Sequence, residues 1–349
     1  MNTSHKLLAS ATIALIGTTA QAADMTGAGA TFPAPVYAKW AEAYKAKTGN
    51  TVNYQAIGSG GGIKQITAKT VDFGATDDPM PGDKLKELGL IQFPAIIGGI
   101  VPVVNVPGIK PGEMVLSGEV LAAIFSGKIA KWNDGAIAKL NSGLKLPNTA
   151  ITVVYRSDSS GTTAGFTTYL AEVAPDFKSA VGAGKTVNWP AGVGGKGNAG
   201  VAANVSKLKG SIGYVEYAYA KQNKLTHTGL INKSGKTVQP DDKTFAAAAA
   251  DADWSKAPGM GIGLNNQAGA DAWPITSASF ILMYETPQDP ARSAQVLKFF
   301  KWALNEGQEL AIALDYVPLP KATVSQIETS WKQIKVGAAA APAMAAAKQ

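Results

Sequence analysis

Three short loops rich in Gly, Ser and Thr stand where a predicted strand gives way to a predicted helix. They read GAGATF at 27–32, GSGGG at 58–62 and RSDSSGTT at 156–163. The first N–H groups of a helix lack intrahelical acceptors and carry partial positive charge, so glycines that admit an anion and hydroxyls that donate to it suit oxyanion binding. Together the loops predict a site for a small tetrahedral anion.

The third loop carries a guanidinium, that of Arg156, directly after a strand expected at 150–155. Arginine matches phosphate with two parallel hydrogen bonds, which lysine does not. Helix capping alone explains Ser160 or Thr162 equally well, but three such loops, one with Arg, favour an anion site. Asp158 either orients Arg156 or caps its own turn.

Asp77 is a carboxylate beside this anion site, after the strand expected at 71–75. Phosphate keeps a proton near neutral pH and sulfate does not. A buried carboxylate that accepts this proton therefore favours phosphate, whereas sulfate would leave it facing a bare like charge. The other interpretation is that Asp77 caps the following turn, and spacing alone does not decide between the two.

Other chemistry finds little support in the residue types. Beyond the first 22 residues the chain has one His, His227, which we interpret as a surface residue, and it has no Cys. Zinc sites of the usual His/Cys type are excluded by count, and neither a Gly-x-Ser-x-Gly nucleophile motif nor a P-loop is present. We expect no catalytic residue, no metal and no cofactor.

The N-terminus reads as a signal peptide over residues 1–22. A basic start is followed by an apolar run from Leu7 and by Ala20-Gln21-Ala22, a small-x-small pattern that predicts cleavage near Ala22. No Cys follows for lipid attachment, which favours a freely diffusing periplasmic protein. No later stretch reaches the ~20 apolar residues of a membrane helix.

Strands and helices alternate from Met25 onward, which predicts an α/β fold with mixed sheets flanked by helices. The length predicts two domains, and two long apolar strands, at 93–104 and 275–283, are expected to cross between them. Residues 246–272 predict a surface insertion and 336–349 a disordered low-complexity tail. The net charge of +7 comes from scattered Lys, so we expect no nucleic-acid partner.

The motifs resemble those of the periplasmic phosphate-binding proteins of bacterial Pst-type ABC transporters, from about Met25 to Lys335. They are TGAGATFPAPVY (26–37), IGSGGG (57–62), VDFGATD (71–77), RSDSSGT (156–162) and IGYVEYAYA (212–220). The resemblance implies a two-lobed periplasmic binding protein fold of type II with a two-strand hinge. Lobe 1 would comprise 23–97 and 278–335, and lobe 2 would comprise 98–277.

The resemblance also implies the ligand contacts and the role. Asp158 would restrain Arg156, and the phosphate would be held by Ala30, Thr31, Phe32, Ser59, Asp77, Arg156, Ser160, Gly161 and Thr162. The protein would bind inorganic phosphate with high affinity by cleft closure, as a monomer, and deliver it to a membrane permease and ATPase complex. Departures from the family pattern, at Gly60 and Thr76, lie next to these positions.

Two alternatives remain. One is a receptor for another tetrahedral oxyanion such as sulfate, which Asp77 disfavours. The other is a secreted phosphatase with a Ser of the third loop as nucleophile, which lacks an evident base and metal ligands. An adhesive or matrix-binding role has no positive feature in the sequence. We therefore expect a binding protein and not an enzyme.

Overall fold

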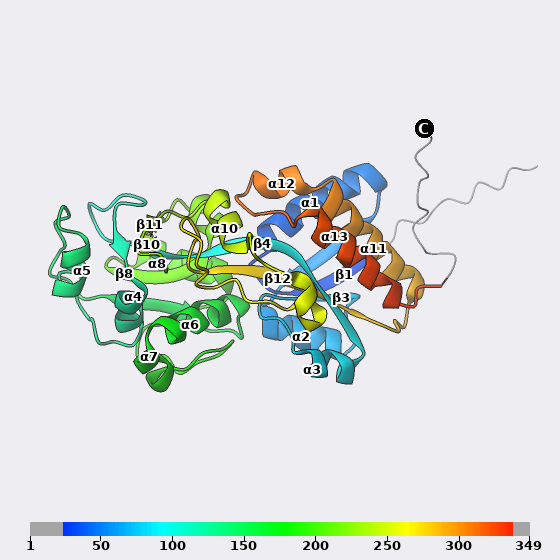
Figure 1. The fold of residues 1–349 in the computed structure, drawn as a ribbon, viewed down its shortest axis with the longest axis horizontal. Coiled ribbons are helices and arrows are strands. Elements are labelled where there is room, and N and C mark those ends of the chain that lie inside the picture. Colours follow the sequence, from blue (N-terminus) through cyan, green and yellow to red (C-terminus); the bar gives the residue numbers. More distant parts are fainter. Residues whose placement is uncertain (1–23, 338–349) are drawn as a thin grey trace, which may run out of the picture.

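The computed structural model describes residues 24–337. The expected signal peptide and nearly all of the expected tail lie outside these residues. Figure 1 shows two lobes side by side, with the strands β4 and β12 running through the middle of the molecule. The described residues thus form a two-lobed α/β fold, as expected.

The first lobe is built from the two ends of the described chain. Glycines close several of its elements; α1, for example, ends at Gly49, whose left-handed φ of 78° suits a residue without Cβ. The elements are β1 (Asp24–Gly29), α1 (Ala34–Thr48), β2 (Thr51–Ala56), α2 (Ser59–Thr67), β3 (Phe73–Thr76), α3 (Gly82–Leu88), α11 (Pro290–Asn305), α12 (Gln308–Ile312), α13 (Lys321–Ser330) and a 3-10 turn at Trp331–Gln333.

The second lobe holds the middle of the chain. Its elements are β5 (Val115–Leu116), α4 (Gly118–Phe125), α5 (Gly135–Leu140), β6 (Thr152–Arg156), α6 (Gly161–Val173), α7 (Pro175–Ala180), β7 (Val193–Gly195), α8 (Gly197–Lys207), β8 (Ser211–Glu216), α9 (Tyr217–Gln222), β9 (Thr226–His227), β10 (Gly229–Ile231), β11 (Thr237–Val238) and α10 (Asp242–Ala249). Two 3-10 turns follow, at Trp254–Lys256 and Pro258–Met260.

One sheet path runs through both lobes, in the order β2-β1-β3-β12-β4-β8-β6-β7. β4 (Leu90–Val104) makes the connection, because it pairs with β12 (Thr276–Tyr284) as far as Gly99 and with β8 from Ile100 onward. The β1, β2 and β3 ladders are parallel, as are those of β6 with β7 and β8, whereas the two crossing strands pair antiparallel. Within the strand expected at 93–104 to cross between domains, β4 thus changes partner between Gly99 and Ile100.

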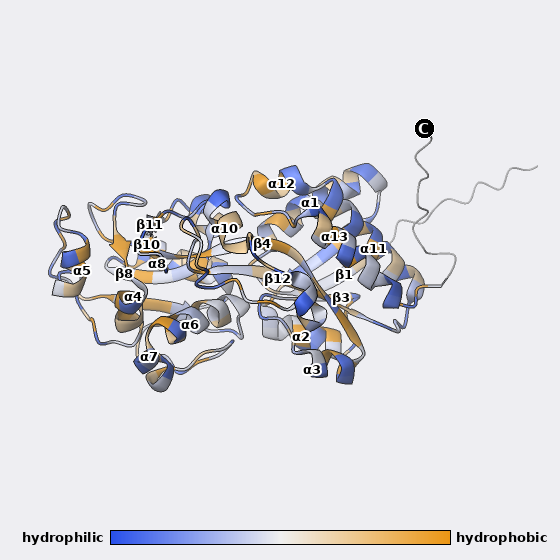
Figure 2. Ribbon diagram, in the orientation of Figure 1, coloured by the Kyte–Doolittle hydropathy of each residue, from blue (hydrophilic) through white to orange (hydrophobic). Residues whose placement is uncertain are grey.

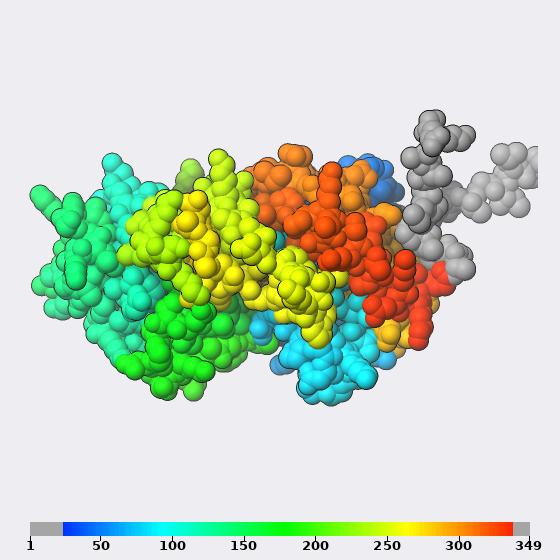
Figure 3. Space-filling view, in the orientation of Figure 1, coloured from blue at the N-terminus to red at the C-terminus, as the bar shows by residue number. Residues whose placement is uncertain are grey.

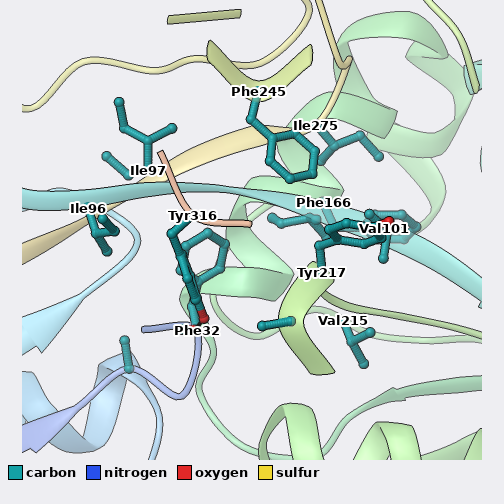
Figure 4. Close-up of a cluster of buried hydrophobic side chains, with 14 of the residues drawn as sticks. Phe32, Ile96, Ile97, Val101, Phe166, Val215, Tyr217, Phe245, Ile275 and Tyr316 are labelled. Atoms are coloured by element: carbon teal, nitrogen blue, oxygen red, sulfur yellow. Dashed lines mark hydrogen bonds between the residues drawn. The ribbon is translucent and has the colours of Figure 1, made fainter. Parts of the chain in front are cut away.

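The glycine pair lets large side chains lie against both faces of β4. Successive strand residues face opposite sides. A Cβ at Gly98 would lie 3.0 Å from Cζ of Phe32, and one at Gly99 would lie 2.0 Å from a ring carbon of Phe245. Figure 4 shows Phe245 on one side of the strand and Phe32 with Tyr316 on the other. All three are buried, so no larger residue fits at either glycine without a shift.

Helices cover the sheet with their apolar faces. In the first lobe α1 buries Tyr37, Trp40 and Tyr44, and Tyr37 and Tyr44 meet Phe300 and Phe299 of α11 edge to face. Figure 2 shows hydrophilic colour on much of α13 and hydrophobic colour along β4. These rings fix α1, the helix that follows the first loop, against α11.

The segment at 246–272 differs from its predicted place as a surface insertion. Trp254, Leu264 and Ala272 are buried. The Gln92 side chain of β4 donates to the Gly259 carbonyl (3.1 Å), and the Asn265 side chain donates to a carbonyl of α6 (2.8 Å). The segment thus joins both lobes, and Figure 3 shows it crossing the front between them in yellow. Its low periodicity hid these contacts, because they use irregular backbone rather than one helix face.

We predict that Gly99→Ala destabilises the protein by about 1–3 kcal/mol, because the added methyl overlaps the buried Phe245 ring. Urea unfolding followed by fluorescence measures this change. Gly143→Ala is the matched control, since a Cβ there meets nothing within 4 Å. Equal unfolding midpoints for Gly99→Ala and the wild type would contradict the steric reason given for the glycine pair.

Candidate functional site

The second and third loops meet between the lobes, where their glycines allow close approach. The Gly60 N–H donates to the Ser159 carbonyl (3.0 Å), and the Gly161 N–H donates to Ser59 Oγ (3.1 Å). A Cβ at Gly161 would lie 2.8 Å from the Asp77 nitrogen. Glycine therefore lets the first turn of α6 reach the opposite lobe. From the sequence we expected these glycines to admit an anion, whereas here they admit another segment of the protein.

Arg156 ends β6, and its side chain is only 1% exposed. Its Nε and Nη2 donate to the two carboxylate oxygens of Asp158 at 2.8 and 2.6 Å, and Nη1 lies 3.3 Å from Thr162 Oγ1. Burial raises the pKa of Asp158, but the hydrogen bonds and charge of Arg156 outweigh it and hold that pKa below its ordinary value. The structure therefore gives Asp158 the orienting position against Arg156.

Asp77 follows β3 and is 3% exposed. Its Oδ1 has no hydrogen-bond partner within residues 24–337, and its Oδ2 lies 3.5 Å from Ser59 Oγ. The next turn is closed by the Thr76 hydroxyl, which bonds to Asp78, so the Asp77 carboxylate does not cap it. A buried acceptor without a partner is costly, which suggests that a group absent from the described residues completes it.

Burial raises the pKa of Asp77 to about 7, and the nearby Ser279 hydroxyl, the Arg156 charge and the Ser59 hydroxyl oppose this rise. The Ser279 hydroxyl is near Asp77 but makes no hydrogen bond of ordinary geometry to it. The carboxyl thus holds a proton at pH values where an exposed aspartate is ionised. Desolvation between the lobes is the physical cause. At neutral pH this group is therefore poised either to accept a proton or to give one.

The first loop brings Ala30, Thr31 and Phe32 to the same place, but in unequal roles. The Ala30 N–H donates to the Ala75 carbonyl (2.9 Å), which is at odds with the expectation that this amide reaches the anion. The N–H groups of Thr31 and Phe32 have no acceptor among the described residues. The sheet register accounts for Ala30, because it extends the pairing of β1 with β3 by one residue.

The sequence left open whether Ser160 and Thr162 cap a helix or bind an anion, and the structure gives the two residues different positions. Ser160 caps α6, since its Oγ accepts from the Thr163 N–H (3.0 Å). Thr162 sits inside the first turn and makes no capping bond. Both side chains are fully buried beside Gly161. The capping interpretation therefore holds for Ser160, while the Thr162 hydroxyl is left for another role.

Several polar groups between the lobes escaped the sequence interpretation. Asn198 of α8 donates to both Thr31 and Thr162, the Tyr219 hydroxyl donates to the Thr31 carbonyl (2.7 Å), and Lys185 pairs with Asp78 across the lobes. The Gly-rich stretch before Asn198 was a signal for the first of these, since it reads as a fourth loop before a helix. Tyr219 and Lys185 had no such signal, because no pattern sets them apart from the other tyrosines and lysines of the sequence.

Glu216 is the second buried carboxyl near the lobe boundary. Its Oε2 lies 2.8 Å from the Tyr316 hydroxyl, which donates to the Phe32 carbonyl (2.6 Å), and its Oε1 accepts from the Ala218 N–H (3.0 Å). Burial raises the pKa of Glu216 to about 8. Glu216 thus links the end of β8 to the first loop through Tyr316.

Features of other chemistries are not gathered here. Within residues 24–337 no group of three or more His, Cys, Asp or Glu side chains is placed to hold a metal ion. His227 lies on β9 with its ring against Tyr217, and it is half-buried rather than on the surface as predicted. Burial lowers its pKa. In the part of the chain described, no helix has the length and apolar character to cross a membrane.

The fold and the enclosed site define a two-lobed binding protein, and comparisons agree. The model of the PBP superfamily domain matches residues 17–306. The phosphate-binding protein PstS of Pasteurella multocida is 59% identical over 314 residues, covering 90% of this chain and 91% of that protein, and that of Haemophilus influenzae is 57% identical, covering 90% and 94%. The chain belongs to the PstS family of phosphate-binding proteins.

Solved structures show the same fold at greater sequence distance. A phosphate-binding protein from Stenotrophomonas maltophilia superposes with a TM-score of 0.67 at 21% identity, covering 88% of this chain and 93% of that one. A phosphate ABC transporter substrate-binding protein from Clostridium perfringens, solved with bound phosphate, gives 0.61 at 18% identity, covering 85% and 100%. At these identities the likeness concerns the fold alone.

We predict that the stability of the phosphate-free protein falls as the pH rises from 5 to 8. A carboxyl whose pKa is raised by folding stabilises the folded state fully below its unfolded value near 4, and this contribution is lost as the pH rises through about 7 for Asp77 and about 8 for Glu216. Glu216→Gln should flatten the fall by up to about 1.4 kcal/mol per pH unit.

Urea unfolding at each pH, in buffer free of phosphate, measures the effect. Glu309→Gln, an exposed carboxyl on α12, is the control and should reproduce the wild-type slope. Parallel curves for Glu216→Gln and the wild type would show that Glu216 does not hold a proton in the folded protein.

Proposed function

We propose that this protein is a receptor that binds inorganic phosphate between its lobes. The observation that carries the proposal is the Asp77 carboxylate, buried with one oxygen unpartnered beside Arg156. The guanidinium supplies the charge for an oxyanion, and Asp77 accepts the proton that phosphate keeps. The contacts we propose are Thr31, Phe32, Ser59, Asp77, Arg156, Ser160, Gly161 and Thr162, with Ala30 as a structural neighbour and Asp158 behind Arg156.

Lobe closure supplies the binding energy in this proposal. Fixed N–H and O–H groups replace the water around the ion, and they act more strongly in a site from which water is excluded. The contacts of Gly60 with Ser159, of Gly161 with Ser59 and of Lys185 with Asp78 join the lobes around the site. The hinge would lie in β4 and β12, with boundaries near 97/98 and 277/278, although the turns at 254–260 lie against the first lobe.

Lobe closure and membership of the family both support a role in phosphate transport. The curated relatives are named phosphate-binding proteins, and one structural neighbour is described as a phosphate ABC transporter substrate-binding protein. We propose that this chain, exported to the periplasm after cleavage near Ala22, delivers phosphate as a monomer to a membrane permease and ATPase complex. A partner that contacts both lobes at once distinguishes the closed form from the open one. No turnover of phosphate esters is expected.

We predict that Asp77→Asn lowers the ratio of phosphate to sulfate affinity by at least about tenfold, or ~1.4 kcal/mol. The introduced amide can donate a hydrogen bond to sulfate, whereas the carboxylate repels sulfate. The amide is also neutral, so it no longer offers the phosphate proton a charged acceptor. Isothermal titration calorimetry with both anions at pH 7.5 measures the ratio. Asp83→Asn, an exposed carboxylate on α3, should leave it unchanged. An unaltered ratio in Asp77→Asn would remove the basis for phosphate selection.

Arg156→Ala should weaken the binding of phosphate and sulfate alike, by at least about tenfold, because the guanidinium serves the charge that both ions carry. Arg292→Ala provides a matched control, since Arg292 is the second of the two arginines in the sequence and pairs with Asp289 and Asp72 instead. Competition against labelled phosphate measures both. If Arg156→Ala binds as the wild type does, the proposed site is wrong.

A further inference from the structure

Asn198 lies at the start of α8, where its backbone N–H and both polar atoms of its side chain are hydrogen-bonded. Its backbone N–H and one hydrogen of Nδ2 donate to Thr31 Oγ1, at 3.2 and 2.8 Å. The other Nδ2 hydrogen faces Thr162 Oγ1 at 3.2 Å. Its Oδ1 accepts from the Glu216 N–H at 3.0 Å. The side chain is completely buried, so no bond to bulk water competes with this arrangement.

The orientation of the Asn198 amide is fixed by chemistry. The Glu216 N–H belongs to the backbone and can only donate, so the Asn198 atom that faces it must be the oxygen. The nitrogen then faces the two threonines. Left-handed Gly197, with φ of 68° and its N–H on Asp158, brings α8 into position for this contact. Asn198 is therefore set as a donor toward Thr31 and Thr162.

A hydroxyl has one hydrogen to donate and two lone pairs that accept. The two lone pairs of Thr31 Oγ1 are taken by the two Asn198 N–H groups. Those of Thr162 Oγ1 are taken by Asn198 Nδ2 and by Arg156 Nη1. Each threonine is left with its own hydrogen, for which no acceptor is found among residues 24–337. Both hydroxyls are thereby committed to donation.

We propose that Asn198 is the positioning residue that sets the hydrogen-bond polarity of the anion site, by making the Thr31 and Thr162 hydroxyls donors only. The inference rests on the proposed function, since the bound anion is the acceptor that both hydroxyls require. Ser59 follows a similar rule without Asn198: its Oγ accepts from the Asp77 and Gly161 N–H groups, so it too can only donate, and its hydrogen faces Asp77 Oδ2 at 3.5 Å. Asp77 then stands out as the acceptor in a ring of donors.

The test is a double-mutant cycle on phosphate affinity, measured by isothermal titration calorimetry with inorganic phosphate. Asn198→Leu, which keeps the size and removes the donors, should weaken binding about 10- to 100-fold in the wild-type background. In the Thr31→Val/Thr162→Val background, where the hydroxyls are gone, the same change should cost threefold or less. A purely structural role for Asn198 gives an equal loss in both backgrounds, and that result would overturn the inference.

Asn198→Asp is the second variant, in case Asn198→Leu does not fold. It keeps the size and the bond from the Glu216 N–H but turns the donor toward the threonines into an acceptor, so its loss of affinity should likewise shrink in the doubly substituted background. Asn204→Asp, on the same helix but bonded to the Gly194 carbonyl, is the control and should bind within twofold of the wild type. If the wild-type protein binds no phosphate, the proposed function fails and this inference with it; if it binds and the cycle is additive, this inference alone fails.

Discussion

The site depends on the electrostatic interaction between two buried groups, the Asp77 carboxylate and the Arg156 guanidinium, which make no direct hydrogen bond to each other. Two donor atoms of Arg156, Nε and Nη2, are bonded to Asp158. Asp77 keeps one carboxylate oxygen without a hydrogen-bond partner among residues 24–337. Burying such an oxygen is costly. The arrangement is stable only if something between the lobes satisfies both groups, and an oxyanion that bears a proton satisfies both at once.

The architecture serves that arrangement by letting the lobes meet closely. Gly161 brings the first turn of α6 against Ser59 and Asp77, and Gly98 and Gly99 let rings lie on both faces of the crossing strand β4. The surrounding hydroxyls are held as donors by backbone amides and by Asn198. Once the lobes are closed, donors and one acceptor held in fixed positions replace the water around the anion without further reorganisation.

Much of this could be predicted from the sequence, because local signals carried it. The strand and helix alternation, the two crossing strands and the pairing of Arg156 with Asp158 all follow from short motifs. The segment at 246–272 could not be placed, since its contacts with Gln92 and Gly165 come from irregular backbone. Asn198 and Tyr219 were missed because Thr31, the partner they share, lies more than 160 residues away from both in the chain. The bond from the Ala30 amide to the Ala75 carbonyl was not foreseen, because it depends on sheet register.

The pH dependence of sulfate binding by the unmodified protein tests the central claim most directly. If a single proton must lie between Asp77 and the bound anion, sulfate binds only when the carboxyl itself supplies that proton. Burial, which raises the pKa of Asp77 to about 7, places this change within reach of ordinary buffers. Because the carboxyl is already about half protonated at pH 7, sulfate affinity should gain only about twofold below that pH. We predict that sulfate affinity falls about tenfold per pH unit between pH 7 and pH 9, where the carboxyl loses its proton. A sulfate affinity that is flat over this range, or equal to that of phosphate at pH 8, would contradict the role assigned to Asp77.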